Sequence, residues 1–406
     1  MTVCCRSSNR VVVILGRSTV IATSEQGRLV IVGSGIGAVS QLTFEAAGWI
    51  KAADVVCYLL ADPLTERWII EHAKATEDLA RLHRTDRPRM EAYRAMADRM
   101  VELARGGRRV VGVFYGHPGV FTSPTHWAIA AARAQGIPAR MLPAVSAEDC
   151  LFADLGIDPG DGACQSFEAT DMIIRARVPA TDAHLIVWQV GVVAALDLRA
   201  GGGHIEVLVH YLERFYPGTH QVTHYQAAQN VVTEPVIDTV ALSDLGTLPL
   251  TVTSTLYVPP VGTRDYDLDL AAAVELDGEG PEHPGSAPDL TTEPPDADPA
   301  AGAAPDWYRP VADAPSRLAA LVMSLSIDPG LIEAVAADPQ PYLEALGLDV
   351  IERWAFLARD QTWINACIRE GSGPAAAVAL GAARTVQEAQ AFFVHPRDGR
   401  LVRRKT

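Results

Sequence analysis

The sequence predicts an α/β protein: a two-lobed region built on a doubly wound parallel sheet, followed by an α-helical region and a flexible tail. Up to residue 142, short apolar runs alternate with stretches of helical spacing, a pattern typical of parallel strands linked by helices. From residue 164 the strand signals come closer together, which indicates a second α/β lobe. After residue 315 helical spacing takes over, and we predict helices at 316–325, 331–337 and 349–370.

The first lobe begins after a weakly patterned extension, residues 1–28. Residues 29–33 predict a strand that enters a G-x-G-x-G turn and opens a βαβ unit. This spelling is a weak dinucleotide signal, because neither Asp54 nor Asp62 clearly fills the acidic position that such sites carry further along. The first-lobe elements that we predict are helices at 42–52, 65–77, 88–105 and 125–135, strands at 55–60, 109–114 and 140–142, and a helix from Ser146.

The second lobe is richer in strands. Domain interfaces are favoured positions for ligand pockets, so we expect a cleft between the two lobes. The predicted elements of the second lobe are strands at 165–174, 184–190, 221–228 and 254–258, and a helix at 205–215.

Composition excludes some classes of function. The 406 residues are 49% hydrophobic and 20% charged, enough to bury a sizeable core and to form more than one unit. The net charge of −15 argues against a nucleic-acid partner, which needs a basic footprint. Nine acidic residues lie between Glu275 and Asp306, with no Lys or Arg among them, so much of the acidity describes a connector.

The cysteines and the apolar runs indicate a cytoplasmic protein. The six cysteines show no CxxC spacing, which favours reduced thiols over disulfides or a metal site. The apolar stretch at residues 11–15 is too short for a signal sequence, and no run of about 18 apolar residues occurs. We therefore expect no metal and no membrane segment.

Two loops contain the residues that indicate a ligand-binding pocket. Residues 113–121, Val-Phe-Tyr-Gly-His-Pro-Gly-Val-Phe, end a buried strand in a glycine-rich loop, where open α/β sheets bind ligands. Residues 141–155 run from strand to loop to helix, with Ser146 at the N-cap and Glu148 and Asp149 in the first helical turn. Side by side, the loops would form a pocket. Alone, the Gly-His-Pro-Gly stretch would be no more than a turn.

Together these segments resemble the tetrapyrrole-methylase class of S-adenosyl-L-methionine-dependent methyltransferases. Within that class the chain is similar to the omphalotin-type borosin precursors, which are peptide backbone α-N-methyltransferases. The resemblance covers about residues 29–260 and 315–370. It implies an N-terminal extension (1–28), a methyltransferase domain (29–261), an acidic Pro/Gly-rich connector or clasp (262–314), a helical substrate-presenting region (315–372) and a tail with the core peptide (373–406).

The resemblance also implies a binding site for S-adenosyl-L-methionine, with S-adenosyl-L-homocysteine as product. Gln189 and Ala227 stand at strand ends, where backbone groups can hold an adenosine; ordinary strand termination is the alternative. The residues that match the family's cofactor positions are Tyr115, His117, Val120, Phe121, Ala147, Gln189, Ala227, Ser254 and Thr255.

The candidate catalytic pair lies on the helix after Pro88. Arg89 and Tyr93 are four residues apart and share a helix face. An amide nitrogen is a poor nucleophile until it loses its proton, so we expect Tyr93 to act as the base and Arg89 to stabilise its phenolate and the developing imidate oxygen. Alternatively, Tyr93 packs in the core, since Met96 and Met100 continue a helical stripe from it.

The chain departs from the family pattern just before this pair. His83 stands where the family has an active-site tyrosine, and Ala80 replaces a second tyrosine. His83 could position or polarise the acceptor carbonyl, or relay a proton. It could equally be an exposed loop histidine in a polar stretch.

The C-terminal segment has two aromatic residues and, on sequence alone, no core to join. The resemblance makes it the substrate, with Phe392, Phe393, Val394 and His395 as acceptors, whereas Pro396 has no amide hydrogen. Family members are interlocked homodimers, so the tail of one subunit would reach the cleft of the other, and a protease would release the product.

Two alternatives stay open. The enzyme could act in trans on a separate precursor peptide or on a tetrapyrrole-like small molecule. The helical region could instead be a module that binds a partner protein, with an inert tail.

Overall fold

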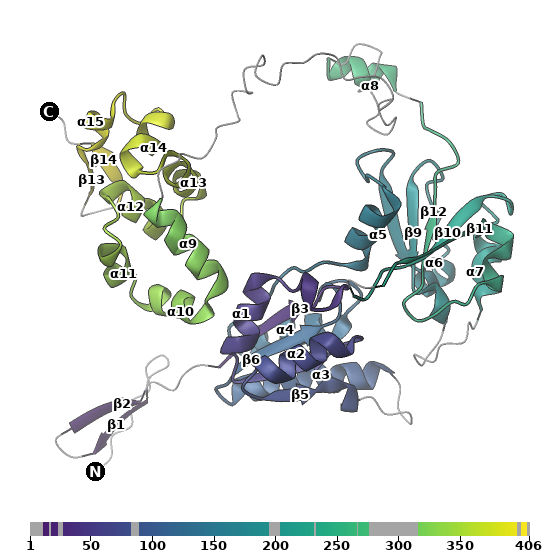
Figure 1. The fold of residues 1–406 in the computed structure, drawn as a ribbon, viewed down its shortest axis with the longest axis horizontal. Helices are drawn as coiled ribbons and strands as arrows, with labels where there is room; N and C mark the ends of the chain where they lie inside the picture. The colour runs from purple at the N-terminus through teal and green to yellow at the C-terminus, as the bar shows by residue number, and fades with distance from the viewer. Residues whose placement is uncertain are drawn as a thin grey trace. The chain divides into compact units, whose positions relative to one another are not determined.

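The computed structural model describes residues 11–15, 18–22, 27–82, 89–194, 204–230, 233–265, 267–275, 316–395 and 399–403. The chain divides into two compact units (Figure 1). The first comprises residues 1–46 and 53–289, and the second comprises residues 47–52 and 290–406. The two lobes predicted from the sequence both belong to the first unit.

The first lobe is a five-stranded parallel sheet with the strand order β5-β4-β6-β3-β7. Helices α3 and α4 pack on each other and against this sheet (Figure 1). Buried apolar side chains such as Ile31, Met96 and Phe114 form the core. The elements are β3 (Arg28–Gly33), η1 (Ala38–Gln41), α1 (Phe44–Ala52), β4 (Val55–Leu59), α2 (Pro63–His72), β5 (Thr76–Asp78), η2 (Leu79–Leu82), α3 (Arg89–Arg105), β6 (Arg109–Phe114), α4 (Ser123–Ala134) and β7 (Ala139–Met141).

One prediction in this lobe is wrong. The helix expected at 65–77 ends at His72, because the next residue, Ala73, is extended. Residues 76–78 instead form β5, which pairs with β4 at the edge of the sheet. Backbone pairing with a strand distant in sequence overrides the local helical pattern.

The second lobe is a mixed sheet with the order β11-β10-β12-β9-β8, in which only β8 and β9 are parallel. The strand expected at 165–174 is wrong in its second half: the Glu168 carboxylate accepts the N–H of Asp171 at 2.7 Å and starts a helix there. The elements are α5 (Ala147–Leu155), β8 (Cys164–Glu168), α6 (Ala169–Ile174), β9 (His184–Trp188), η3 (Val190–Val192), α7 (Ile205–Leu212), β10 (Gln221–Gln226), β11 (Val236–Ala241), η4 (Leu242–Thr247) and β12 (Thr255–Val258).

The second unit is helical, as expected. Asp328 ends one helix and caps the next through the N–H groups of Gly330 and Leu331. The single helix expected at 349–370 is broken at Arg359, whose φ of 55° is left-handed. The elements are α9 (Arg317–Ile327), α10 (Pro329–Ala337), α11 (Gln340–Ala345), α12 (Val350–Ala358), α13 (Gln361–Glu370), α14 (Gly373–Ala379), α15 (Val386–Ala389), β13 (Phe392–Val394) and β14 (Leu401–Arg403).

Three smaller elements lie outside these layers. Strands β1 (Val11–Leu15) and β2 (Ser18–Ala22) pair in an antiparallel hairpin within the N-terminal extension. Helix α8 (Leu268–Ala273) begins the connector. No single helix in the described part of the chain is long and apolar enough to cross a membrane, while α9 and α10, bent by 118°, meet the length and composition together.

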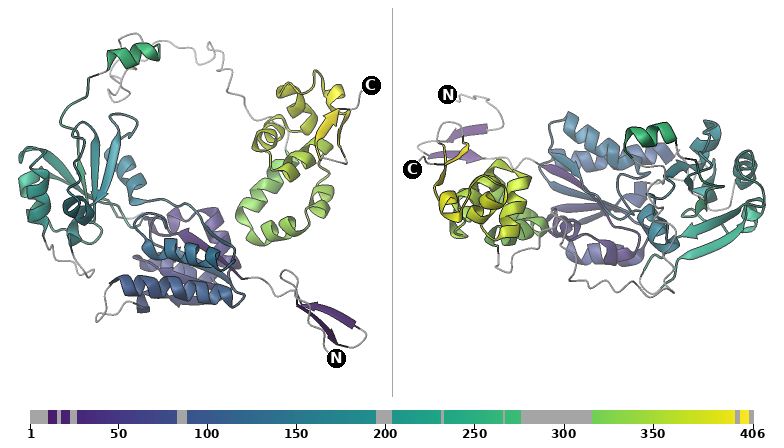
Figure 2. Two further views of the ribbon diagram at one scale, coloured as in Figure 1. Left: turned by 180° about the vertical axis from the view of Figure 1, so that it is seen from behind. Right: turned by 90° about the horizontal axis from the view of Figure 1, so that it is seen from above.

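The C-terminal segment differs from expectation, because it finds a core. Phe392 and Leu401 pack against the buried side chains of the helical unit, among them Leu343 and Ile351. The hairpin of β13 and β14 lies beside the helices in all views (Figures 1 and 2). The sequence alone did not show this core, because its residues come from helices distributed over some seventy positions.

The amino-terminal end of α12 carries a buried carboxyl. Asp349 accepts the N–H groups of Ile351 and Glu352, and Glu352 accepts the N–H of Asp349, a capping box. Burial raises the pKa of the Glu352 carboxyl from 4.5 to about 7, and the charge of Asp349 adds to the shift. Because the pKa is higher in the folded state, the stabilising effect is complete below about pH 4.5 and is lost as the pH rises through about 7.

We therefore expect Glu352→Gln to stabilise the helical unit relative to the natural chain at pH 8, by about 1–3 kcal/mol, and to change little at pH 4.5. Glutamine keeps the capping hydrogen bond without the buried charge. Chemical denaturation followed by tryptophan fluorescence measures the difference. Glu344→Gln, an exposed position on α11, is the control. Equal stabilities of the Glu352 variant and the natural chain at pH 8 would refute the expectation.

Candidate functional site

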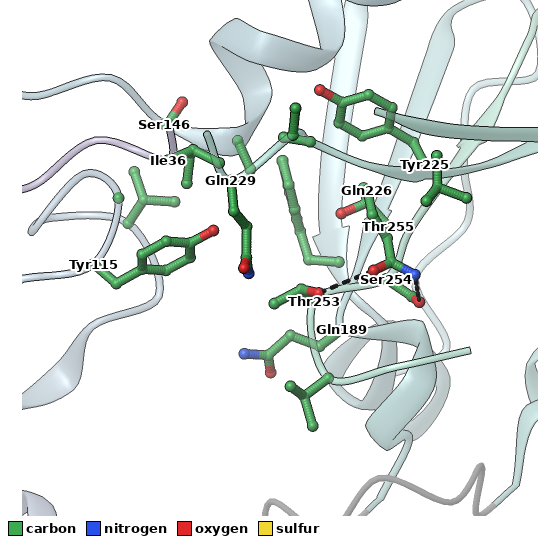
Figure 3. Close-up of a pocket in the computed structure, with 18 of the residues that line it drawn as sticks. Ile36, Tyr115, Ser146, Gln189, Tyr225, Gln226, Gln229, Thr253, Ser254 and Thr255 are labelled. Carbon is green, nitrogen blue, oxygen red and sulfur yellow. Dashed lines mark hydrogen bonds between the residues drawn. The ribbon is translucent and has the colours of Figure 1, made fainter. Parts of the chain in front are cut away.

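One cavity of about 500 Å³ lies between the two lobes, within the size range of small-molecule sites. Its walls come from the loop after β6 and from the ends of β9, β10 and β12 (Figure 3). All nine residues expected to bind the cofactor line this cavity. The structure thus brings them together, although their individual roles stay predictions. They are Tyr115, His117, Val120, Phe121, Ala147, Gln189, Ala227, Ser254 and Thr255.

Two glycine-rich turns, which follow β3 and β6, contact each other at the carboxyl edge of the first-lobe sheet. Strands β3 and β6 are neighbours, so the turns that follow them lie side by side. The N–H of Gly116 donates to the carbonyl of Gly35 at 3.0 Å, and both residues have left-handed backbones, with φ values of 70° and 72°. A Cβ at Gly33 would lie 2.1 Å from the Gly116 oxygen. Only glycine permits this approach.

Gln41 resolves the ambiguous G-x-G-x-G signal. Its Oε1 accepts the N–H groups of Ile36 and Gly37 at 2.7 and 2.8 Å. In a dinucleotide site, donors of such a turn face the pyrophosphate. Here a side chain of the same loop satisfies them, so the turn shapes the cavity rather than binding a phosphate. Sequence reasoning missed Gln41, and no local pattern marks it.

Tyr115 and Gln229 approach each other from the two lobes. Figure 3 shows the Tyr115 hydroxyl directed toward the Gln229 side chain. Burial raises the pKa of the Tyr115 phenol to about 12, and a hydrogen bond with Gln229 opposes this shift. Tyr115 is therefore a neutral phenol at physiological pH and serves as a hydrogen-bond donor rather than as a base.

Ser254 is completely buried and its hydroxyl is engaged within the protein. Its Oγ accepts the N–H of Thr251 at 2.8 Å and lies 2.8 Å from Nε2 of the buried His224. His224 Nδ1 lies 3.2 Å from an oxygen of Asp238. Because a carboxylate only accepts, Nδ1 carries the proton and Nε2 accepts the Ser254 hydroxyl. Ser254 therefore shapes the wall, and burial rules it out as an attacking nucleophile.

Aromatic side chains complete the cavity. Phe121 and Trp188 lie with their ring centres 5.8 Å apart. The buried indole N–H of Trp188 finds no hydrogen-bond partner among the residues that the structure describes, so a ligand could accept from it. Phe121 and Gln189 also hold left-handed backbones, which in non-glycine residues often marks functional sites. Sequence reasoning missed Trp188, although it directly precedes Gln189.

Of the three catalytic candidates, the structure describes the side chain of Tyr93 alone, and Tyr93 does not line this cavity. Tyr93 lies on α3, is partly buried and packs against the first-lobe core, which includes Met96 and Met100, as the alternative interpretation proposed. It is absent from the residues lining the cavity. Arg89 begins α3, but its side chain lies outside the described residues, as does His83 altogether. The four acceptor candidates lie at β13 in the second unit.

Comparisons with known proteins all find methyltransferases. Residues 28–228 match the family model of Tetrapyrrole (Corrin/Porphyrin) Methylases. A methyltransferase/ribosomally synthesized cyclic peptide gymnopeptides precursor of Gymnopus fusipes is 36% identical, covering 84% of this chain and 87% of the relative. The corresponding omphalotin A precursor of Omphalotus olearius is 35% identical, over 85% and 88%. A type I borosin cyclic peptide precursor of Coprinopsis marcescibilis is 35% identical, over 87% and 95%.

We expect Tyr115→Phe to weaken S-adenosyl-L-methionine binding about 3- to 10-fold, because one neutral hydrogen bond is lost. The loss should be the same at every pH from 6 to 9, since the phenol titrates near 12. Isothermal titration calorimetry measures the affinity. Tyr257→Phe is a matched control, because its hydroxyl contacts His184 at 2.7 Å and it does not line the cavity. A loss that grows from pH 6 to 9 would contradict the assignment.

Proposed function

Because this chain belongs to the family of methyltransferases that are also ribosomally synthesized borosin peptide precursors, we propose that it methylates backbone amide nitrogens of its own C-terminal tail. The methyl donor is S-adenosyl-L-methionine. One structural observation carries the proposal: all nine residues that match the family's cofactor positions line a single cavity of ligand size. The similarity also extends beyond the tetrapyrrole-methylase region, over 84–87% of the chain.

The cavity residues fit this cofactor. When bound, S-adenosyl-L-methionine supplies an electrophilic methyl group on a positively charged sulfur. The faces of Phe121 and Trp188 suit an adenine ring or a sulfonium cation. Tyr115 is a donor for polar groups of the ligand, as is the Trp188 indole N–H, which has no partner among the described residues.

Methyl transfer requires that an amide nitrogen become nucleophilic. In our proposal the Tyr93 phenolate takes the amide proton, and the Arg89 guanidinium stabilises first that phenolate and then the imidate oxygen. The imidate nitrogen forms the new N–C bond as the C–S bond breaks, and the electron pair remains on sulfur, giving S-adenosyl-L-homocysteine. A base acts on the acceptor peptide rather than on the cofactor, so it need not line the cofactor cavity.

We expect Tyr93→Phe and Arg89→Ala to lower methyl transfer about 100-fold or more, because each removes a group that acts in proton transfer. Cofactor affinity should not change. Arg94→Ala is the matched control: it removes a guanidinium of the same helix that lies over Trp127, and it should retain activity. Single-turnover rates from intact mass, with calorimetry for affinity, measure both effects. Full activity in Tyr93→Phe would remove Tyr93 from the mechanism.

The purified chain, given S-adenosyl-L-methionine, should gain mass in methyl-sized steps. Tandem mass spectrometry should place the methyl groups on backbone nitrogens between Phe392 and His395, and deletion of residues 391–406 should abolish the gain while cofactor binding persists. A constant mass with activity on an added peptide or tetrapyrrole would favour action in trans. A constant mass without any activity would favour the helical region as a partner-binding module.

We further propose an interlocked homodimer, in which each subunit methylates the tail of the other and a separate protease later releases the product. Co-expression tests the exchange. A Tyr93→Phe chain that keeps its tail is produced together with an active chain that lacks residues 391–406. Methylation of the former supports transfer between subunits, and its absence in mixed dimers shows that each chain modifies its own tail.

A further inference from the structure

The four proposed acceptor residues lie at one strand of a hairpin. β13 pairs antiparallel with β14, so that Phe393 faces Val402 and Val394 faces Leu401, and the N–H of His395 donates to the carbonyl of Arg400 at 2.8 Å. Antiparallel pairs alternate between those that exchange hydrogen bonds and those that do not. Counting back from His395, the amide of Phe393 points into the ladder, whereas those of Phe392 and Val394 point away from β14.

Helix α12 holds this hairpin. The Trp354 indole nitrogen donates to the carbonyl of Gly399 at 3.0 Å. Phe392 and Leu401 are partly buried against the core of the same unit, and Val394 helps to line a groove along α12 with Val350, Arg353 and Leu357. A two-stranded hairpin of this length is marginal alone in water. Its stability therefore depends on the α12 surface, defined here as Val350, Arg353, Trp354 and Leu357.

We propose that the α12 surface is a dock that stores the unmodified acceptor hairpin, and that methylation of Phe393 or His395 disfavours its return. The proposal rests on the function proposed above. An amide hydrogen that is bonded to a carbonyl is not available to a base, so these two nitrogens react only after the hairpin leaves the dock. The observed hairpin is thus a resting arrangement of the substrate.

Methylation then shifts the equilibrium toward the undocked hairpin. A methyl on the Phe393 or His395 nitrogen replaces a ladder donor and places a carbon between strands that lie about 4.8 Å apart. The carbonyl opposite loses its partner, and re-docking becomes less favourable by about tenfold or more. A methyl on Val394 points outward and leaves the ladder intact. The dock therefore distinguishes methylated from unmethylated tails at alternate positions.

Hydrogen exchange of the intact, unmethylated chain without cofactor tests the dock independently of catalysis. Phe393 and His395 amides should exchange about tenfold or more slowly than those of Phe392 and Val394. Trp354→Phe keeps an aromatic ring but removes the donor to Gly399, and it should speed exchange at both protected amides. Trp363→Phe is the matched control, because Trp363 packs edge-to-face on Trp354 with ring centres 5.5 Å apart and makes no described contact with Gly399. Equal exchange at all four amides would overturn the proposal.

Semisynthetic full-length chains test the second part. One carries a single N-methyl group at Phe393 and the other at Val394. In the chain methylated at Phe393, the His395 amide hydrogen should exchange about tenfold faster than in the unmodified chain. In the chain methylated at Val394, it should exchange at the same rate as in the unmodified chain. Equal protection in both would overturn the proposal. These outcomes need no enzymatic turnover, so a chain that never gains mass would refute the proposed function while leaving the dock established or overturned on its own measurements.

Discussion

The cavity between the two lobes depends on how closely two backbones approach at the carboxyl ends of β3 and β6. The Gly35 and Gly116 turns hydrogen-bond to each other, and a side chain at Gly33 would occupy the space of the Gly116 carbonyl. This contact fixes the start of the loop that carries Tyr115, His117 and Phe121. Because Gln41 satisfies the donors of the first turn, the same glycine pattern that could bind a phosphate instead forms the base of a different pocket.

The second lobe holds its wall of the cavity with a buried polar network. Asp238 sets the tautomer of His224, which accepts the hydroxyl of Ser254, and Ser254 in turn accepts the N–H of Thr251. Every member is satisfied, so the network costs little despite its burial and defines one arrangement of the turn before β12. The two lobes thus position the cavity by different means: backbone proximity in one and a side-chain network in the other.

In the helical unit, docking of the hairpin and methylation of the tail both require the same backbone N–H groups. A backbone N–H can stabilise a β-ladder or give up its proton to a base, but it cannot do both at once. The hairpin at α12 uses the N–H of His395 as a donor, and this is one of the nitrogens proposed for methylation. The enzyme must therefore balance the docked tail against the tail delivered for reaction, and each added methyl changes that balance.

The sequence by itself determined the two-lobed α/β class and the helical region, because strand and helix periods are local patterns. The nine candidate cofactor residues followed from the resemblance to a known family and stay predictions. The sequence could not determine β5, the start of α6, the role of Gln41, the place of the Trp188 indole in the cavity or the core that receives Phe392. Each of these depends on contacts between segments far apart in the chain, or on a hydrogen-bond partner that no spacing reveals. Only the tertiary structure decided that the nine residues share one cavity, that Tyr93 packs outside its lining, and that the tail has a place to dock.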